Sequence, residues 1–312
     1  MFVEGYGSRE FDIEPASILE KTFRHGGWAR RRRLIFDAMR RVGFRHHRLD
    51  NFAECGAGAW VMKRLDGQDL KIQSNCCHDR FCVPCGITRA TTLTQNLKSQ
   101  VKDMQPLFIT LTLRHSSTPL KEQMDRLYRS FLVLRRRPFW LAAIKGGAAF
   151  FEVKISERDG LWHPHLHILA DGRFIPKLEL SIQWHSVTGD SSIVDIKRPR
   201  AAGEVAAYVT KYVTKPADSS VYEHPDKLDE LLTTLRGRRL VATFGDWTKL
   251  KLTEILPDGH TWVPVMHLDE LLHAAAAQEP AALDLLEALQ RKYPSFANVL
   301  PLPPPPPVDT DF

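Results

Sequence analysis

The stretch AAFFEVKISERDGLWHPHLHILA, residues 148–170, decides how the middle of this 312-residue chain folds. Two runs of β-forming residues flank the turn-rich ERDG, a pattern that predicts an antiparallel hairpin. Successive side chains of a strand point to opposite faces, so His163, His165 and His167 share one face. These three imidazoles indicate either a metal site or an ordinary surface stripe, since His-x-His is common on strands.

The register of the hairpin favours the metal site. If ERDG forms the loop, Ser156 pairs with Leu161. Glu152 then lies directly opposite His165, about 5 Å away and on the same face. Two imidazoles and one carboxylate would converge there on a divalent cation, for which we expect Mg²⁺ or Mn²⁺.

The spacing along the strand selects which histidines belong to this set. Alternate residues of a strand are about 7 Å apart, so His163 and His167, about 13 Å apart, do not easily share one ion. Leu166 suits an inward position between two ligands, whereas Pro164 lacks an N–H and marks the start of the strand. We therefore predict His165 and His167 as ligands, and His163 as a residue that either supports the ligands or contacts the substrate.

Composition and charge indicate the kind of protein and its partner. The chain is 43% hydrophobic, enough to bury a core in one or two domains. It has no apolar run of membrane-spanning length and no signal-peptide layout at its start, so we expect a soluble cytoplasmic protein. Residues 1–220 carry a net charge of +12, whereas residues 221–312 hold 8 basic and 14 acidic residues. The positive block favours nucleic acid as a partner.

Two arginine clusters are the candidate DNA contacts outside the histidine strand. The first lies in a basic helix expected over residues 22–50, and the second ends a helix expected over 119–136. A solvated helix face is the alternative interpretation. The residues are Arg30, Arg31, Arg32, Arg33, Arg135, Arg136 and Arg137.

Five cysteines in a chain without a secretory signal indicate metal binding or free thiols rather than disulfides. Cys77, Cys82 and Cys85 have the spacing of a zinc knuckle, and Cys55 is a candidate fourth ligand. Cys76 or His78 could replace one member of the set. A redox pair in CVPC is the weaker alternative, because no βαβ pattern surrounds it.

Two tyrosines lie one helical turn apart in EVAAYVTKYVTKP, residues 204–216. Tyr208 and Tyr212 share one face, and Lys211 and Lys215 each follow a tyrosine by three residues. Aromatic pairs at this spacing usually pack in a core. Regularly interleaved lysines instead favour a nucleophilic role, because a cation stabilises a phenolate or a phosphate.

Together, FITLTLRH (108–115), HPHLHIL (163–169) and YVTKYVTK (208–215) resemble, in order, the three motifs of the HUH endonucleases. The tyrosine pair is similar to that of two-tyrosine rolling-circle replication initiators. CCHDRFCVPC resembles the zinc segment of plasmid initiators and of two-tyrosine transposases. The resemblance covers about residues 55–215.

The resemblance implies a ferredoxin-like nuclease domain in which a tyrosine attacks single-stranded origin DNA, forms a 5′-phosphotyrosine bond and frees a 3′-OH. His165 and His167 match the metal histidines, and Tyr208 and Tyr212 match the nucleophiles. Glu152 matches the third ligand less closely, because that position varies in the family.

Termination is left open by the same resemblance. One-tyrosine initiators place a carboxylate one turn before the tyrosine, where this chain has Tyr208 before Tyr212 and Glu204 before Tyr208. The second nucleophile is therefore either the other tyrosine or a water activated by Glu204.

We expect an α+β protein with a central antiparallel sheet, an N-terminal zinc segment and a helical C-terminal region. The predicted parts are a basic helical region (1–54), a zinc segment (55–104), an HUH nuclease domain (105–220), a helical region (221–298) and a disordered proline-rich tail (299–312).

The predicted function is initiation of rolling-circle replication on single-stranded and origin DNA. A two-tyrosine transposase is the alternative within the same chemistry. A zinc-containing DNA-binding regulator with buried tyrosines is the alternative from another class. Whether a host helicase joins the initiator through the acidic C-terminal region is left open.

Overall fold

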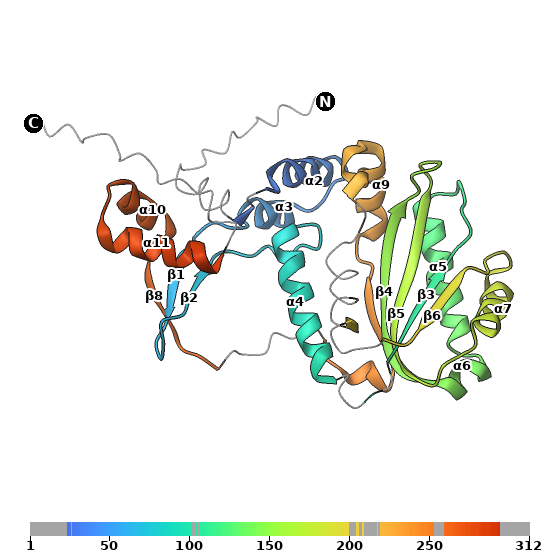
Figure 1. Ribbon diagram of the computed structural model, residues 1–312. Helices are drawn as coiled ribbons and strands as arrows, with labels where there is room; N and C mark the ends of the chain where they lie inside the picture. Colours follow the sequence, from blue (N-terminus) through green and yellow to red (C-terminus); the bar gives the residue numbers. More distant parts are fainter. Residues whose placement is uncertain are drawn as a thin grey trace, which may run out of the picture. The chain divides into compact units, whose positions relative to one another are not determined.

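The computed structural model of this chain describes residues 24–25, 27–100, 104, 106–199, 204–205, 208, 217, 219–252 and 259–293. These residues form helices and antiparallel strands, which confirms the α+β class (Figure 1). They group into two compact units. One falls within residues 30–49 and 78–256, and the other within residues 1–29, 50–77 and 257–312.

A five-stranded sheet forms the centre of the larger unit, and every neighbouring pair of its strands is antiparallel. The histidine strand lies in the middle of the sheet, paired on both sides. In spatial order the strands are β6 (Val194–Lys197), β3 (Pro106–Thr112), β5 (Trp162–Gly172), β4 (Ile144–Ile155) and β7 (Val241–Gly245).

The hairpin between β4 and β5 has the predicted loop. Ser156 N–H donates to the Leu161 carbonyl at 2.9 Å, which closes the turn. The Asp159 carboxylate accepts from Leu161 N–H at 3.0 Å, and Gly160 has φ of 67°, a conformation that favours glycine. The register of the pair is therefore the one predicted from the sequence, with Glu152 opposite His165.

Helices lie on both sides of this sheet (Figure 1). α5 (Leu120–Leu134), α6 (Pro138–Ala143) and α7 (Lys177–Thr188) lie on one side, and α4 (Val83–Gln100) lies on the other. α5 begins after Pro119 and buries apolar residues spaced three or four apart, as an amphipathic helix should. These are Leu120, Met124, Leu127, Phe131 and Leu134.

The α4 side of the sheet has its own buried cluster. It contains Leu93 and Leu97 from α4, strand residues of the same face, and residues from later in the chain. The strand residues are Phe108, Ala148, Phe150 and Leu169, and the later residues are Val205, Trp247 and Leu252. This apolar cluster therefore lies beside His163, His165 and His167 on the same face of the sheet, which we call the histidine face.

The basic segment forms two helices rather than the single one predicted over 22–50. α2 (Ala29–Arg41) and α3 (His46–Ala53) are separated by a short turn in which Gly43 has φ of 67°. Glycine at a positive φ ends a helix readily, which explains the break. The remaining short elements of the larger unit are η1 (Ser219–Glu223), α9 (Pro225–Leu235) and η2 (Asp246–Lys249).

The smaller unit contains a three-stranded antiparallel sheet in the order β2 (Leu70–Gln73), β1 (Trp60–Arg64) and β8 (Trp262–His267). Helices α10 (Leu268–Ala276) and α11 (Pro280–Lys292) bury their apolar residues against it. The buried residues are Ala59, Val61, Leu70, Leu268, Leu271, Leu272, Ala275, Ala282, Leu286 and Leu289.

The region 221–298, predicted to be helical, contains helices α9, α10 and α11 but also two strands that the prediction did not include. β7 pairs with β4 at the edge of the larger sheet, and β8 pairs with β1. Both strands are five or six residues long and find their partners far away in sequence, so local periodicity could not reveal them.

None of the helices in the described ranges combines the length and apolarity needed to cross a bilayer.

Candidate functional site

The site expected on the histidine strand is built at the centre of the larger sheet. His163, His165 and His167 alternate along β5 and face Lys154, Glu152 and Phe150 of β4 in the observed register. Neighbouring imidazole rings are close, with centroids 4.2 Å apart for the first pair and 6.0 Å for the second.

Glu152 and His167 form the most buried part of this site. His167 Nε2 donates to Glu152 Oε2 at 2.9 Å, and the residues are only 4% and 6% exposed. Thr110 of β3 lies opposite His167, and its hydroxyl is 3.2 Å from Nδ1. Burial raises the pKa of the Glu152 carboxyl, but the His167 hydrogen bond and the Lys154 ammonium at 3.4 Å outweigh it, so that the pKa is lowered.

His165 contributes an imidazole nitrogen without a partner. Its Nδ1 is buried and, among the described residues, has no hydrogen-bonding neighbour. Burial, reinforced by the nearby His163 and His167, lowers the pKa of His165 to about 3. A neutral imidazole with an unused buried nitrogen is the form that binds a metal ion.

Tyr208 lies beside the histidine strand. Its ring stacks on Phe108 of β3 with centroids 3.9 Å apart, and its hydroxyl donates to the Ile109 carbonyl at 3.3 Å. The His167 ring lies edge-on to it, with centroids 6.1 Å apart. Glu204 of the same segment is exposed. The other predicted catalytic residues, Lys211, Tyr212 and Lys215, lie outside the described residues.

Sequence reasoning missed a fourth imidazole at this site. His115, just beyond β3, packs its ring on His163 with centroids 4.0 Å apart. Its Nδ1 lies 3.3 Å from the Asp159 carboxylate in the hairpin loop. The antiparallel pairing of β3 with β5 was the available signal, because it brings the end of FITLTLRH to the start of the histidine strand.

A second missed residue supports the start of β5. The half-buried Glu230 carboxylate of α9 accepts from Trp162 Nε1 and from Leu120 N–H, each at 2.6 Å. Trp162 is the first residue of β5 and is 3% exposed. Glu230 therefore links the histidine strand to the first turn of α5.

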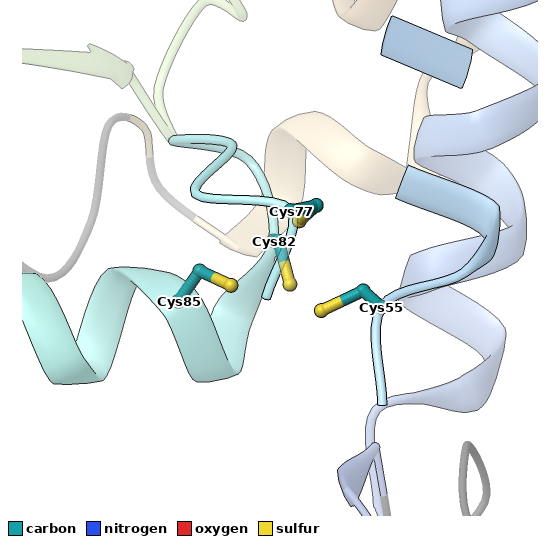
Figure 2. A group of neighbouring side chains, drawn as sticks. All are labelled: Cys55, Cys77, Cys82 and Cys85. Carbon is teal, nitrogen blue, oxygen red and sulfur yellow. The ribbon is translucent and has the colours of Figure 1, made fainter. Parts of the chain in front are cut away.

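Four cysteines come together as a second candidate site. One sulfur atom from each of Cys55, Cys77, Cys82 and Cys85 lies within 4.8 Å of all the others, and their side chains converge in Figure 2. Three of the four are buried, and Cys77 is partly exposed. This set of four cysteines fits tetrahedral zinc, because four soft thiolates at this separation are the usual structural ligands.

The backbone around Cys82 and Cys85 favours thiolates. Cys82 directly precedes α4 and Cys85 lies in its first turn, where the helix dipole stabilises negative charge. Asp79 fixes the approach to the helix by accepting from Phe81 N–H at 2.9 Å and pairing with Arg48 at 2.6 Å. The alternatives Cys76 and His78 lie outside the cluster, so Cys55 is the fourth member.

The candidate DNA-binding arginines have varied surroundings. Arg30 pairs with Glu223 at 2.5 Å, and the Arg31 guanidinium lies 3.7 Å from the centre of the Tyr222 ring. Arg135 packs over Phe131 and Phe244, and Arg137 donates to Gln183 at 2.8 Å. Arg32 is partly exposed, and Arg33 and Arg136 are exposed. Because four of these arginines pair or pack with other residues of the chain, fewer of their guanidinium groups are open to a DNA phosphate.

Comparison with known proteins gives three relatives. This chain is similar to proteins named Protein rep. The one from Lactiplantibacillus plantarum is 31% identical over 124 residues, 36% of this chain and 39% of that protein. The one from Staphylococcus aureus is 29% identical over 176 residues, 50% of this chain and 76% of that protein. The one from Streptococcus pneumoniae serotype 2 is 26% identical over 241 residues, 70% of this chain and 75% of that protein.

The first of these matches spans about two fifths of its relative. No family model matches this chain, and no solved structure matches it.

Proposed function

We propose that this protein is a replication initiator that nicks single-stranded origin DNA with a tyrosine and a divalent cation. The observation that carries the proposal is the meeting of His165, His167 and Glu152 on one sheet face, with the Tyr208 ring against His167. The relatives named Protein rep support the replication role.

The donor atoms of this face fit a hard divalent cation. Ligands at neighbouring corners of an octahedron with bonds of about 2.1 Å are about 3.0 Å apart. The 2.9 Å between His167 Nε2 and Glu152 Oε2 is close to that separation, so an ion could replace the proton they now share. The imidazole of His165, whose buried Nδ1 has no hydrogen-bonding neighbour among the described residues, would supply the third donor.

Mg²⁺ or Mn²⁺ held by these residues would polarise the scissile phosphodiester. The chain's own contribution is the nucleophile. The phenolic oxygen of Tyr212 or Tyr208 attacks phosphorus, and its proton is lost. The new O–P bond replaces the bond to the 3′ oxygen, which leaves as a 3′-OH after taking a proton. Lys211 and Lys215 would stabilise the phenolate and the phosphate.

Two nucleophiles would allow a round of replication to end without hydrolysis. One tyrosine holds the 5′ end while the other attacks the regenerated junction, so the bond energy stays in a phosphotyrosine link. Hydrolysis by a water that Glu204 activates is the competing ending. His163 is assigned to the DNA, and the remaining exposed arginines to its phosphates.

Zinc in the four-cysteine cluster has a structural role in this proposal. Structural zinc sites have four protein ligands and no open position, as these four cysteines provide. The cluster includes the first turn of α4, whose Leu93 and Leu97 pack against the sheet. Zinc would therefore hold the helix that covers the histidine face.

The experiment is cleavage of single-stranded oligonucleotides that tile the DNA around the protein's own gene. Wild-type protein with Mn²⁺ or Mg²⁺ should cut at one position and leave a 3′-OH that a polymerase extends. Chelation with EDTA should stop the cut, and re-addition of the cation should restore it. A folded, zinc-loaded protein that binds the DNA and cuts none of the oligonucleotides would instead be a regulator.

A further inference from the structure

The three-stranded sheet of the smaller unit has two faces of different chemistry. Its apolar face packs under α10 and α11. The register assigns to the opposite face alternate residues of β1 and β2 and the β8 residues that pair with those of β1, across a register shift between Val61 and Met62. Those residues are Trp60, Met62, Arg64, Lys71, Gln73, Trp262, Pro264 and His267. We call these eight residues the aromatic face.

Two indole rings and their neighbours organise the aromatic face. The Trp60 ring contacts the His267 ring, with centroids 3.7 Å apart. The Lys71 ammonium lies 4.1 Å from the centre of the Trp262 ring. Trp60, Trp262 and Lys71 are partly exposed, and Gln73 and Pro264 beside them are exposed. Two partly exposed tryptophans on one sheet face provide aromatic surface that a ligand can contact.

The charge of the aromatic face favours an anionic ligand. None of its eight residues is acidic, while Arg64 and Lys71 are basic. Asp66 pairs with Arg64 at 2.8 Å and so offsets one of these two cations, whereas Asp69 pairs with Lys292 of α11; Lys71 is the other cation of the face. Aromatic rings interleaved with cations on a β-sheet bind single-stranded nucleic acid, because bases stack on the rings and phosphates meet the cations.

We propose that the aromatic face binds single-stranded DNA, with one base stacked on Trp60 and another on Trp262. The choice of DNA as the occupant rests on the proposed function. Trp262 lies opposite Arg64, four residues along β1 from Trp60, so the two rings are about 13 Å apart along the strand and receive different bases. The Lys71 ammonium, which lies beside the Trp262 ring, pairs with a DNA phosphate between the two bases. Duplex DNA offers no unstacked base and would bind less tightly.

The first test measures the affinity of the full-length, zinc-loaded protein for fluorescein-labelled oligothymidylate by anisotropy. Loss of one stacking ring should weaken binding roughly 5- to 150-fold, so we expect this for Trp60→Ala and for Trp262→Ala. Trp60→Phe should restore most of the affinity, because a phenyl ring still stacks. Equal affinity of the alanine and wild-type proteins would overturn the proposal.

The second test uses salt to detect the Lys71 contact. Each phosphate contact to a single strand contributes about −0.7 to the slope of log K against log salt concentration. Lys71→Gln should therefore make the slope less negative by about 0.7. Arg291→Gln is the matched control, because it removes the same charge from exposed α11 and should leave the slope unchanged. The same slope for both variants would contradict the proposal.

A third measurement needs no variant and so does not depend on folding of the alanine proteins. Wild-type protein is cross-linked by ultraviolet light to oligonucleotides that contain iodouracil, and the modified peptides are identified. Cross-links in residues 60–73 or 262–267 support the proposal, and cross-links confined to other peptides overturn it.

These results are separable from the nicking reaction. If wild-type protein cuts DNA and the tryptophan variants bind it normally, the proposal that the aromatic face binds DNA is wrong and the proposed function stands. If no DNA is cut but Trp60→Ala weakens binding, the aromatic face stands and the nicking function is wrong.

Discussion

Replacing His167 by alanine separates the catalytic and structural roles of the histidine face. The imidazole hydrogen-bonds to Glu152 at 2.9 Å, and both residues are almost completely buried. Its loss leaves the buried Glu152 carboxylate without this hydrogen bond, with the Lys154 ammonium 3.4 Å away. His167→Ala should therefore lower both the stability of the protein and its rate of DNA cleavage.

The two losses have different sizes. Leaving the buried Glu152 carboxylate without its hydrogen-bond donor costs about 3 kcal/mol, the upper end of the range for an unsatisfied buried group, because the acceptor is charged. Loss of a metal ligand removes several kcal/mol of transition-state stabilisation. At about 1.4 kcal/mol per factor of ten, a loss of 4 kcal/mol slows cleavage about 10³-fold.

The assay combines urea unfolding with single-turnover cleavage of an oligonucleotide at saturating Mn²⁺. The control is the double variant Glu152→Gln, His167→Ala, which replaces the stranded carboxylate with an amide. Its stability should recover by about 2 kcal/mol over His167→Ala, because an unpaired amide costs less to bury than an unpaired charge. Its cleavage should stay at the low rate. Folded His167→Ala protein that cleaves within tenfold of the wild-type rate would refute the assignment.

Three further results are expected. Elemental analysis should find one zinc per chain in the wild type and none in Cys82→Ser; wild-type protein without zinc, with five thiols open to modification, would contradict the zinc assignment. Glu230→Ala should lower the free energy of unfolding by about 2–4 kcal/mol in urea titration, because the N–H groups of Trp162 and Leu120 lose a charged acceptor; a change below 0.5 kcal/mol would show that neither bond matters. Tyr208→Phe should keep some oligonucleotide cleavage through Tyr212 but transfer strands poorly; wild-type behaviour in both assays would leave Tyr208 a packing role.

Local patterns were sufficient for the hairpin and for naming Cys55 as one candidate for the fourth position of the cysteine cluster. The loop ERDG fixed the pairing of Ser156 with Leu161, and one pairing determines every other in a regular antiparallel ladder. Cys55 was a candidate because a knuckle of three thiolates needs a fourth soft ligand, although only the fold shows that it, rather than Cys76, reaches the cluster.

Long-range contacts account for what the sequence did not reveal. β7 and β8 are short, and each is defined by a partner strand far away in sequence. Glu230 resembles any other acidic residue of an amphipathic helix until α9 is placed against Trp162. The basic run of α2 likewise gave no sign that Arg30 would pair with Glu223, because the sequence shows charge but not which charges neutralise one another.

The central claim is that a tyrosine of this chain becomes joined to DNA. The most direct measurement is mass spectrometry of the protein after reaction with the cleaved oligonucleotide and Mn²⁺, followed by denaturation and digestion. We expect a 5′-phosphorylated fragment on the peptide that contains Tyr208 or Tyr212, absent in EDTA and absent when both are phenylalanine. Cut DNA with no protein adduct, or an adduct on another residue, would contradict it.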